Sequence, residues 1–194
     1  MARFNFQSAA AAVCVVSAIM FSSVCRADVI FVGGAPAQKQ ALLALFNSLP
    51  ACCRQNVQIR VQLMPETELV ELVRSGLSSQ EAQSVNAESI DGVYQNDSPT
   101  ITLRQESGGD ELSKTFAHEM GHFVWQRILT DSQRKQYNSV YKTQKSAHCL
   151  VTAYSATSVE EGFAEAYSYQ VTSPSILQSR DRLSSKFIQN IFSD

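Results

Sequence analysis

DELSKTFAHEMGHFVWQRI, residues 110–128, is the stretch of this 194-residue chain that most strongly constrains its fold. Apolar residues recur in it every three or four positions, and this spacing predicts an amphipathic helix from about residue 111 to residue 129. Asp110 follows a glycine-containing loop and is the expected N-cap of that helix. The apolar stripe consists of Leu112, Phe116, Met120, Phe123, Val124 and Ile128.

Two of the three histidines, His118 and His122, lie four residues apart in the middle of this helix. Side chains at positions i and i+4 share one face of a helix, so both imidazoles can reach one ion. Glu119 lies one step round the helix, where a glutamate can take a proton from a metal-bound water. Imidazole and carboxylate are usual ligands of catalytic zinc. The short H-E-x-x-H pattern also occurs by chance in helices that bind no metal.

Catalytic zinc requires a third protein ligand, and carboxylates follow the histidines in the sequence. The H-x-x-G-x-x-H extension of the metzincins is absent. The run SVEEGFAEAY, residues 158–167, predicts a second helix in which Glu161 and Glu165 share a face, while Glu160 is turned away by about 100°. The alternative is a solvated acidic face. Apolar residues among the acids predict a half-buried helix instead, and buried acids need cationic or metal partners.

Tyr154 precedes Glu161 by seven residues. A tyrosine near zinc can donate a hydrogen bond to the oxyanion of a tetrahedral intermediate. The combination of H-E-M-G-H with a tyrosine, six residues and then E-G-F-A-E-A-Y resembles the gluzincin peptidase domains of anthrax toxin lethal factor and the secreted Pro-Pro endopeptidases. The resemblance covers roughly residues 90–192 and implies a zincin catalytic fold.

The resemblance also implies roles for individual residues and for one strand. The strand before the zinc helix is a sheet edge in gluzincins, so residues 100–104 are expected to bind extended peptide by β-addition; an ordinary edge strand is the alternative. Gly162 stands where these domains have a large apolar residue, which implies looser packing. The assignments are His118, His122 and Glu161 as zinc ligands, Glu119 as general base, Tyr154 as oxyanion donor, and Glu165 as an acid that orients a ligand histidine.

The remaining patterns predict an α+β fold in which a small, mostly antiparallel sheet packs on helices. Alternating apolar runs predict strands, and 3.6-residue periods predict helices. We expect the site to lie between the zinc helix and the helix over residues 158–171. The predicted strands are residues 28–32 and 57–63 and a hairpin of residues 92–94 and 100–103; the other predicted helices are residues 38–49, 66–74, 79–87 and 132–145 and a closing helix around residues 176–191.

The first 27 residues have the pattern of a signal peptide. Arg3 gives a positive n-region, and residues 8–24 are small and apolar. Cleavage after Ala27 places small residues at positions −3 and −1 from the cleaved bond, as signal peptidase requires. A membrane anchor and a lipoprotein signal are alternatives, and the apolar run is marginal in length for a span. We expect a secreted or periplasmic protein, bacterial in origin, with no stable membrane insertion after cleavage.

Residues 28–194 are enough for one hydrophobic core and too few for two comfortable domains. Without Arg3 and Arg26, the 16 basic residues of the chain fall to 14, against 18 acidic residues. No basic run is present, which argues against a nucleic-acid partner. We therefore expect a single domain that acts on peptides or proteins.

Three cysteines lie beyond the predicted cleavage point. Adjacent cysteines rarely bond each other, so one of Cys52 and Cys53 is expected to pair with Cys149 in an oxidising compartment. Three free, buried thiols are the alternative.

These observations predict a zinc-dependent metalloendopeptidase that hydrolyses peptide bonds. Two alternatives stay open: a non-catalytic, zinc-containing module that binds a peptide, and a zinc amidase that acts on a cell-wall peptide. The cleaved bond and the oligomeric state do not follow from the sequence.

Overall fold

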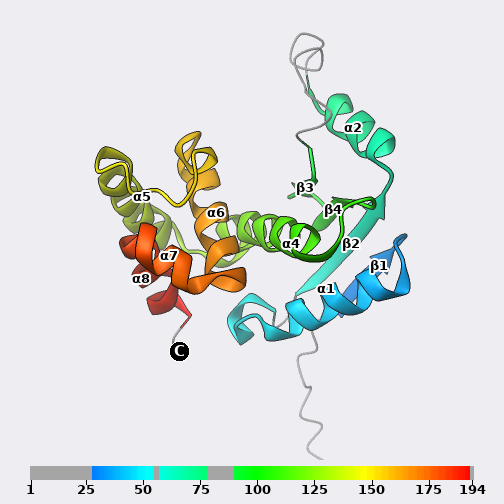
Figure 1. Ribbon diagram of the computed structural model, residues 1–194, viewed down its shortest axis with the longest axis horizontal. Helices are drawn as coiled ribbons and strands as arrows, with labels where there is room; N and C mark the ends of the chain where they lie inside the picture. The colour runs from blue at the N-terminus through cyan, green and yellow to red at the C-terminus, as the bar shows by residue number, and fades with distance from the viewer. Residues whose placement is uncertain (1–27, 55–56, 78–89, 193–194) are drawn as a thin grey trace, which may run out of the picture.

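The helix that carries the H-E-x-x-H motif lies between a small sheet and a group of C-terminal helices (Figure 1). The computed structural model describes residues 28–54, 57–77 and 90–192. The predicted signal peptide, residues 1–27, and the predicted helix over residues 79–87 lie outside the described residues. Within the described ranges, no helix is both long enough and apolar enough to cross a membrane.

The strands are β1 (Asp28–Val32), β2 (Gln58–Met64), β3 (Gly92–Gln95) and β4 (Thr100–Arg104). They form one sheet in the order β1-β2-β4-β3. β1 and β2 pair in parallel, as do β2 and β4, and β3 and β4 are antiparallel. The prediction of a mostly antiparallel sheet is therefore wrong, whereas the α+β class is confirmed. Helix α1 (Pro36–Ser48) connects the parallel strands β1 and β2, because a helical crossover returns the chain in the same direction. Helix α2 (Glu66–Ser75) follows β2 and precedes β3 in the chain.

The sheet edge near the motif is also different from the prediction. β4 lies inside the sheet, between β2 and β3, and four of its five residues are buried. The expected edge role of residues 100–104 is therefore wrong. The edge strand on this side of the sheet is β3, which packs against the helix that carries the motif. β4 is internal because β2 pairs with its other side, a long-range pairing that no local pattern encodes.

The helix predicted over residues 111–129 is confirmed as α4 (Gly109–Phe123), followed by a π-helical turn, η3 (Val124–Ile128). α4 begins before Asp110, so that residue lies in the first turn and is not the N-cap. Acids are favourable in a first turn because the helix dipole is positive there. At the end of η3, the Leu129 N–H bonds the carbonyl five residues earlier at 2.9 Å.

The C-terminal half of the chain is helical, and the predicted helices over residues 132–145 and 158–171 are confirmed within one residue at each end. The predicted closing helix is two helices, because Asp181 has φ −129° and ψ 67° and its carboxylate accepts the Ser184 N–H at 3.1 Å. The elements are α5 (Asp131–Ser146), η4 (Tyr154–Ala156), α6 (Val159–Thr172), α7 (Pro174–Arg180) and α8 (Arg182–Ile191).

One hydrophobic core joins the sheet to the helices, and the predicted apolar stripe of α4 lies in it. The space beside Gly162 of α6 is filled rather than loose. A Cβ at that position would lie 2.7 Å from the ring of Tyr141 on α5, and the hydroxyl of Tyr137 donates a hydrogen bond to the Gly162 carbonyl at 2.9 Å. Tyr141 of α5 therefore occupies the space that a large residue at position 162 would fill.

Helices α4 and α6 approach each other closely at Gly121 and Ala164. A Cβ at position 121 would lie 2.7 Å from the Ala164 Cα and 3.1 Å from its carbonyl oxygen. These are backbone atoms, which cannot move aside without shifting α6. Position 121 is the second variable position of the H-E-x-x-H motif, and it must be glycine for the two helices to pack this closely.

The predicted disulfide is not formed. Cys52, Cys53 and Cys149 are all free. Cys53 is buried in the core, where burial raises the pKa of its thiol, whereas Cys149 lies on the surface after α5 and its thiol bonds the Ala147 carbonyl. Burial in the core therefore separates Cys53 from Cys149, and the exposed Cys52 is also unpaired.

We predict that Gly121→Ala destabilises the protein. The added methyl group meets backbone, and overpacking of this kind costs about 1–3 kcal/mol, against which the better helix propensity of alanine returns about 1 kcal/mol. The expected net loss in the free energy of unfolding is up to about 2 kcal/mol in urea denaturation of the metal-free protein.

Gly76→Ala is the matched control, because a Cβ at position 76 meets only the Val73 carbonyl at an ordinary 3.6 Å. It should change the free energy of unfolding by less than about 0.5 kcal/mol. Equal effects of the two substitutions would contradict the packing argument.

Candidate metal centre

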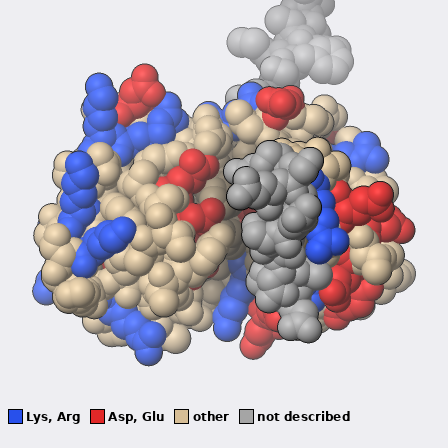
Figure 2. All heavy atoms as spheres, turned by 90° about the horizontal axis from the view of Figure 1, so that it is seen from above, with Lys and Arg blue, Asp and Glu red and all other residues tan. Residues whose placement is uncertain are grey.

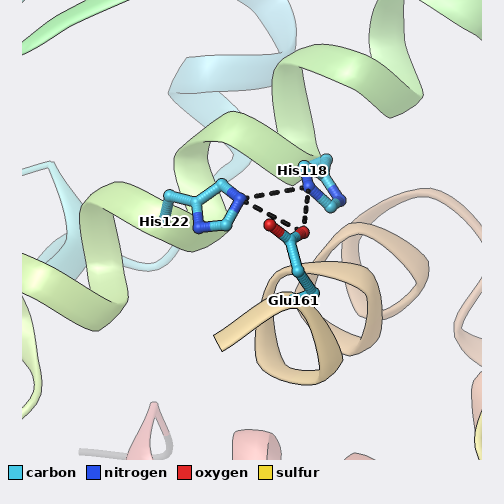
Figure 3. A group of neighbouring side chains, drawn as sticks. All are labelled: His118, His122 and Glu161. Atoms are coloured by element: carbon cyan, nitrogen blue, oxygen red, sulfur yellow. Dashed lines mark hydrogen bonds and ion pairs between the residues drawn. The ribbon is translucent and has the colours of Figure 1, made fainter. Parts of the chain in front are cut away.

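Three side chains from two helices converge on one point between α4 and α6 (Figure 3). The Nε2 atoms of His118 and His122 lie 3.2 Å apart. Oε2 of Glu161 lies 3.2 Å from Nε2 of His118 and 3.5 Å from Nε2 of His122. These three residues form a group that could hold a metal ion.

The beginning of α6 places Glu161 at this point. The Ser158 hydroxyl caps the helix and accepts the Glu161 N–H at 3.0 Å. Glu161 is therefore in the first turn of α6, where a carboxylate is stabilised by the helix dipole. A serine followed by two acids is an N-terminal signal that can be identified in the sequence.

The spacing of the three atoms fits a small cation. Four ligands at about 2 Å in a tetrahedron lie about 3.3 Å from one another, which matches the observed separations. Oε2 of Glu161 is buried and makes no hydrogen bond of acceptable geometry. A buried carboxylate oxygen without a hydrogen bond is costly, and a cation at this point would satisfy it.

Glu165 lies behind His118, as predicted. Its Oε1 is 2.9 Å from Nδ1 of His118, and its Oε2 accepts the Thr152 hydroxyl at 2.7 Å. A carboxylate at Nδ1 keeps the proton on that nitrogen and directs the lone pair of Nε2 away from it, towards the other two ligands. Thr152 was not identified from the sequence, because no local pattern connects it with Glu165.

Glu119 lies beside the three ligands, and its side chain packs between α4 and β3. Its side chain is buried, and the Tyr94 backbone N–H donates a hydrogen bond to it. Burial raises the pKa of the Glu119 carboxyl, an effect that the two histidines and the Tyr94 N–H oppose. Gly92 leaves room for it, because a Cβ there would lie 3.1 Å from Oε1 of Glu119. A carboxyl of raised pKa is suited to accept and return a proton.

The ring of Tyr154 lies next to the ring of His118. Their ring centroids are 5.9 Å apart, and the tyrosine is 53% exposed. Burial of part of the ring and the charge of Glu161 raise the pKa of the Tyr154 hydroxyl to about 12. The hydroxyl therefore stays protonated at neutral pH and can donate a hydrogen bond.

An open cleft of about 800 Å³ runs along these residues, and a smaller hollow of about 360 Å³ continues beyond them. His118, Glu119 and Tyr154 line both, so the site lies at the junction of the two. β3 forms one wall of the cleft with Gly92, Val93 and Tyr94. In the view from above, two groups of acidic atoms lie near the middle of the face, and Lys and Arg are spread over the helical lobe at the left (Figure 2).

Two further contacts in the site were not expected from the sequence. Glu160 is not turned away from the histidines: its Oε1 lies 3.4 Å from Nδ1 of His122 and accepts the side-chain N–H of Gln126 at 2.7 Å. Gln126 is four residues after His122, and this spacing in the sequence indicates that the two side chains share a face of the helix. The sequence does not predict the pairing of Gln126 with Glu160, because that contact depends on how α6 crosses α4.

No protein-family model matches the chain, and no curated protein matches it at a significant level.

We predict one divalent ion per chain. His118→Ala, His122→Ala and Glu161→Ala should each abolish tight binding, because each removes a ligand. Glu165→Ala should weaken binding by about 10- to 100-fold, because it removes only the hydrogen bond behind His118. Metal analysis after dialysis measures the content. Glu111→Ala, an exposed position on the first turn of α4, is the control and should retain the ion.

We also predict that metal binding releases protons. Burial opposes charge on both imidazoles, but the nearby carboxylates of Glu161 and Glu165 raise the pKa of His118 to about 9, and those of Glu160 and Glu161 raise the pKa of His122 to about 10. The metal-free site thus holds protons at neutral pH, and ligation requires their loss. Affinity should increase between pH 6 and pH 8 by about tenfold per unit for each proton released.

Isothermal titration in buffers of different ionisation enthalpy measures that release directly. At pH 7 the expected value is at least one proton per ion. A binding enthalpy that is independent of the buffer would contradict the coupling.

Proposed function

We propose that this protein is a secreted, zinc-dependent peptidase that hydrolyses peptide bonds in an extended substrate. The observation that carries the proposal is the convergence of His118, His122 and Glu161 beside the buried Glu119, at the junction of two hollows. A metal group alone is compatible with a structural site. A buried proton acceptor and a phenol next to an open cleft are features of a catalytic one.

Zinc is the ion that this set of ligands favours, because two imidazoles and one carboxylate are typical of catalytic zinc sites with an open position. Bound there, zinc would lower the pKa of a coordinated water towards neutrality and polarise a substrate carbonyl. Cysteine takes no part, since Cys53 is in the core and the other two thiols are not among the converging residues.

Glu119 accepts the proton of the attacking water and delivers it to the leaving amine. Its raised pKa supports both roles, because a proton acceptor of moderate basicity can also release the proton again. The Tyr94 N–H and the space beside Gly92 keep the carboxylate in place. β3 therefore serves as a wall of the cleft and as a support for the base.

Tyr154 donates a hydrogen bond to the oxyanion that develops on the substrate carbonyl. Its pKa of about 12 keeps the donor proton in place, and its exposure leaves the hydroxyl accessible to substrate. Donors of this kind act by stabilising charge that is present only in the transition state.

The substrate is an extended peptide that lies along the edge strand β3. An unpaired strand edge offers backbone N–H and C=O groups to an added strand, and β3 lines the cleft while its other edge is paired with β4. The hollow beyond His118 and Tyr154 gives space for residues on both sides of the cleaved bond.

Glu119→Gln should retain zinc and lose turnover by about 10²- to 10⁴-fold, because it removes the proton acceptor while preserving volume. Tyr154→Phe should also retain zinc and should lower turnover by about 10²-fold, as expected for one oxyanion donor. Cleavage of a diverse peptide library by zinc-loaded protein, with each variant in parallel, measures both effects. Full activity of Glu119→Gln would sink the mechanism. Binding of peptides without cleavage by the unaltered protein would favour a non-catalytic module.

A further inference from the structure

Each of the two histidines has a carboxylate at the ring nitrogen that faces away from the ligand cluster. Oε1 of Glu165 lies 2.9 Å from Nδ1 of His118, and Oε1 of Glu160 lies 3.4 Å from Nδ1 of His122. Both Nε2 atoms face Glu161. The two imidazoles are thus supported in the same way, by acids that come from the same helix.

Each supporting acid has its own anchor. Thr152 donates its hydroxyl to Glu165 at 2.7 Å, and Gln126 donates its side-chain amide to Glu160 at 2.7 Å. Gln126 belongs to η3, the π-helical turn directly after α4, and single π turns often lie at functional sites. The Gln126 contact fixes Glu160 from outside its own helix.

Adjacent glutamates can serve the same histidine because they leave the helix in different directions. Successive residues of an α-helix are rotated by about 100°, so Glu161 reaches Nε2 of His122 and Glu160 passes to its Nδ1 side. Glu160 is not part of the converging group that could hold a metal ion. Its place is behind the imidazole, not on the ion.

We infer that Glu160, held by Gln126, is a positioning residue for His122: it accepts the Nδ1–H, fixes the tautomer and directs Nε2 at the metal. The inference rests on the proposed function only in requiring that the site holds zinc. A carboxylate behind a ligand imidazole also increases the basicity of that ligand, so both geometry and charge contribute.

The effect of Glu160 should be smaller than that of Glu165. Its contact with the histidine is longer, and its side chain is 33% exposed, against 17% for Glu165. Water screens the more exposed pair. We expect Glu160→Gln to weaken zinc binding by about tenfold, at the lower end of the range for such residues, and Gln126→Ala to weaken it less.

The experiment compares five proteins with the full chain: unaltered, Glu160→Gln, Glu160→Asp, Gln126→Ala and the control Glu111→Gln. Glu111 is exposed and lies two turns before His118. Competition with a chromophoric chelator gives the zinc dissociation constant of each. The ¹H–¹⁵N spectrum of the zinc-loaded protein reports the hydrogen-bonded Nδ1–H of each histidine, and cobalt(II) absorption reports the number of ligands.

Glu160→Gln should shift or broaden the Nδ1–H signal of His122, leave that of His118 in place, and keep the cobalt spectrum of the unaltered protein. If Glu160 only stabilised the fold, Glu160→Gln would not change the His122 signal while leaving the His118 signal in place. Glu160→Asp, which keeps the charge on a shorter side chain, should recover part of the affinity.

Two results would overturn the inference while the proposed function stands. One is that the unaltered protein binds zinc and that Glu160→Gln changes neither the zinc dissociation constant nor the His122 signal. The other is a cobalt spectrum that loses a ligand in Glu160→Gln, because Glu160 would then bind the metal directly. Absence of zinc binding by the unaltered protein would overturn the proposed function, and the inference with it.

Discussion

The contact of α4 with α6 at Gly121 and Ala164 is the constraint on which the site depends. Metal–ligand distances vary by only about 0.2 Å, so the helix that carries the histidines and the helix that carries Glu161 must keep a fixed separation. With backbone atoms in contact at position 121, the carboxylate of Glu161 reaches both imidazoles from the first turn of its own helix. The glycine inside the motif is thus a packing residue that makes the ligand geometry attainable.

The same packing concentrates negative charge. Four carboxylates surround the two imidazoles in a partly buried region, a set that would be strongly unfavourable if every group were ionised and no cation were present. Protons balance the charge in the metal-free protein, which is why the pKa values of both histidines lie above their usual range. A divalent ion can replace those protons. Affinity for a cation and sensitivity to pH therefore have one physical origin, the acids Glu119, Glu160, Glu161 and Glu165.

The local features of the chain were predictable. The period of the apolar residues in α4 identified the helix, and the i, i+4 spacing of His118 and His122 put both imidazoles on one face. The separation of Glu161 from Glu165 put them on one face of α6, where they reach opposite nitrogens of His118. Three of the predictions that failed concerned long-range pairing: the direction of the strands, the internal position of β4 and the bridge to Cys149.

The sequence by itself determined the two helices that carry the site, α4 and α6, the residues able to bind a metal and the face of each helix on which they lie, because these depend on spacing along a single helix. Only the tertiary structure decided which edge of the sheet borders the cleft and which partners hold the ligands. Thr152 behind Glu165, the Tyr94 N–H on Glu119 and Gln126 on Glu160 are contacts between different elements. Such contacts depend on how the helices and strands cross, and the crossing is set by packing of the whole core rather than by any short run of residues.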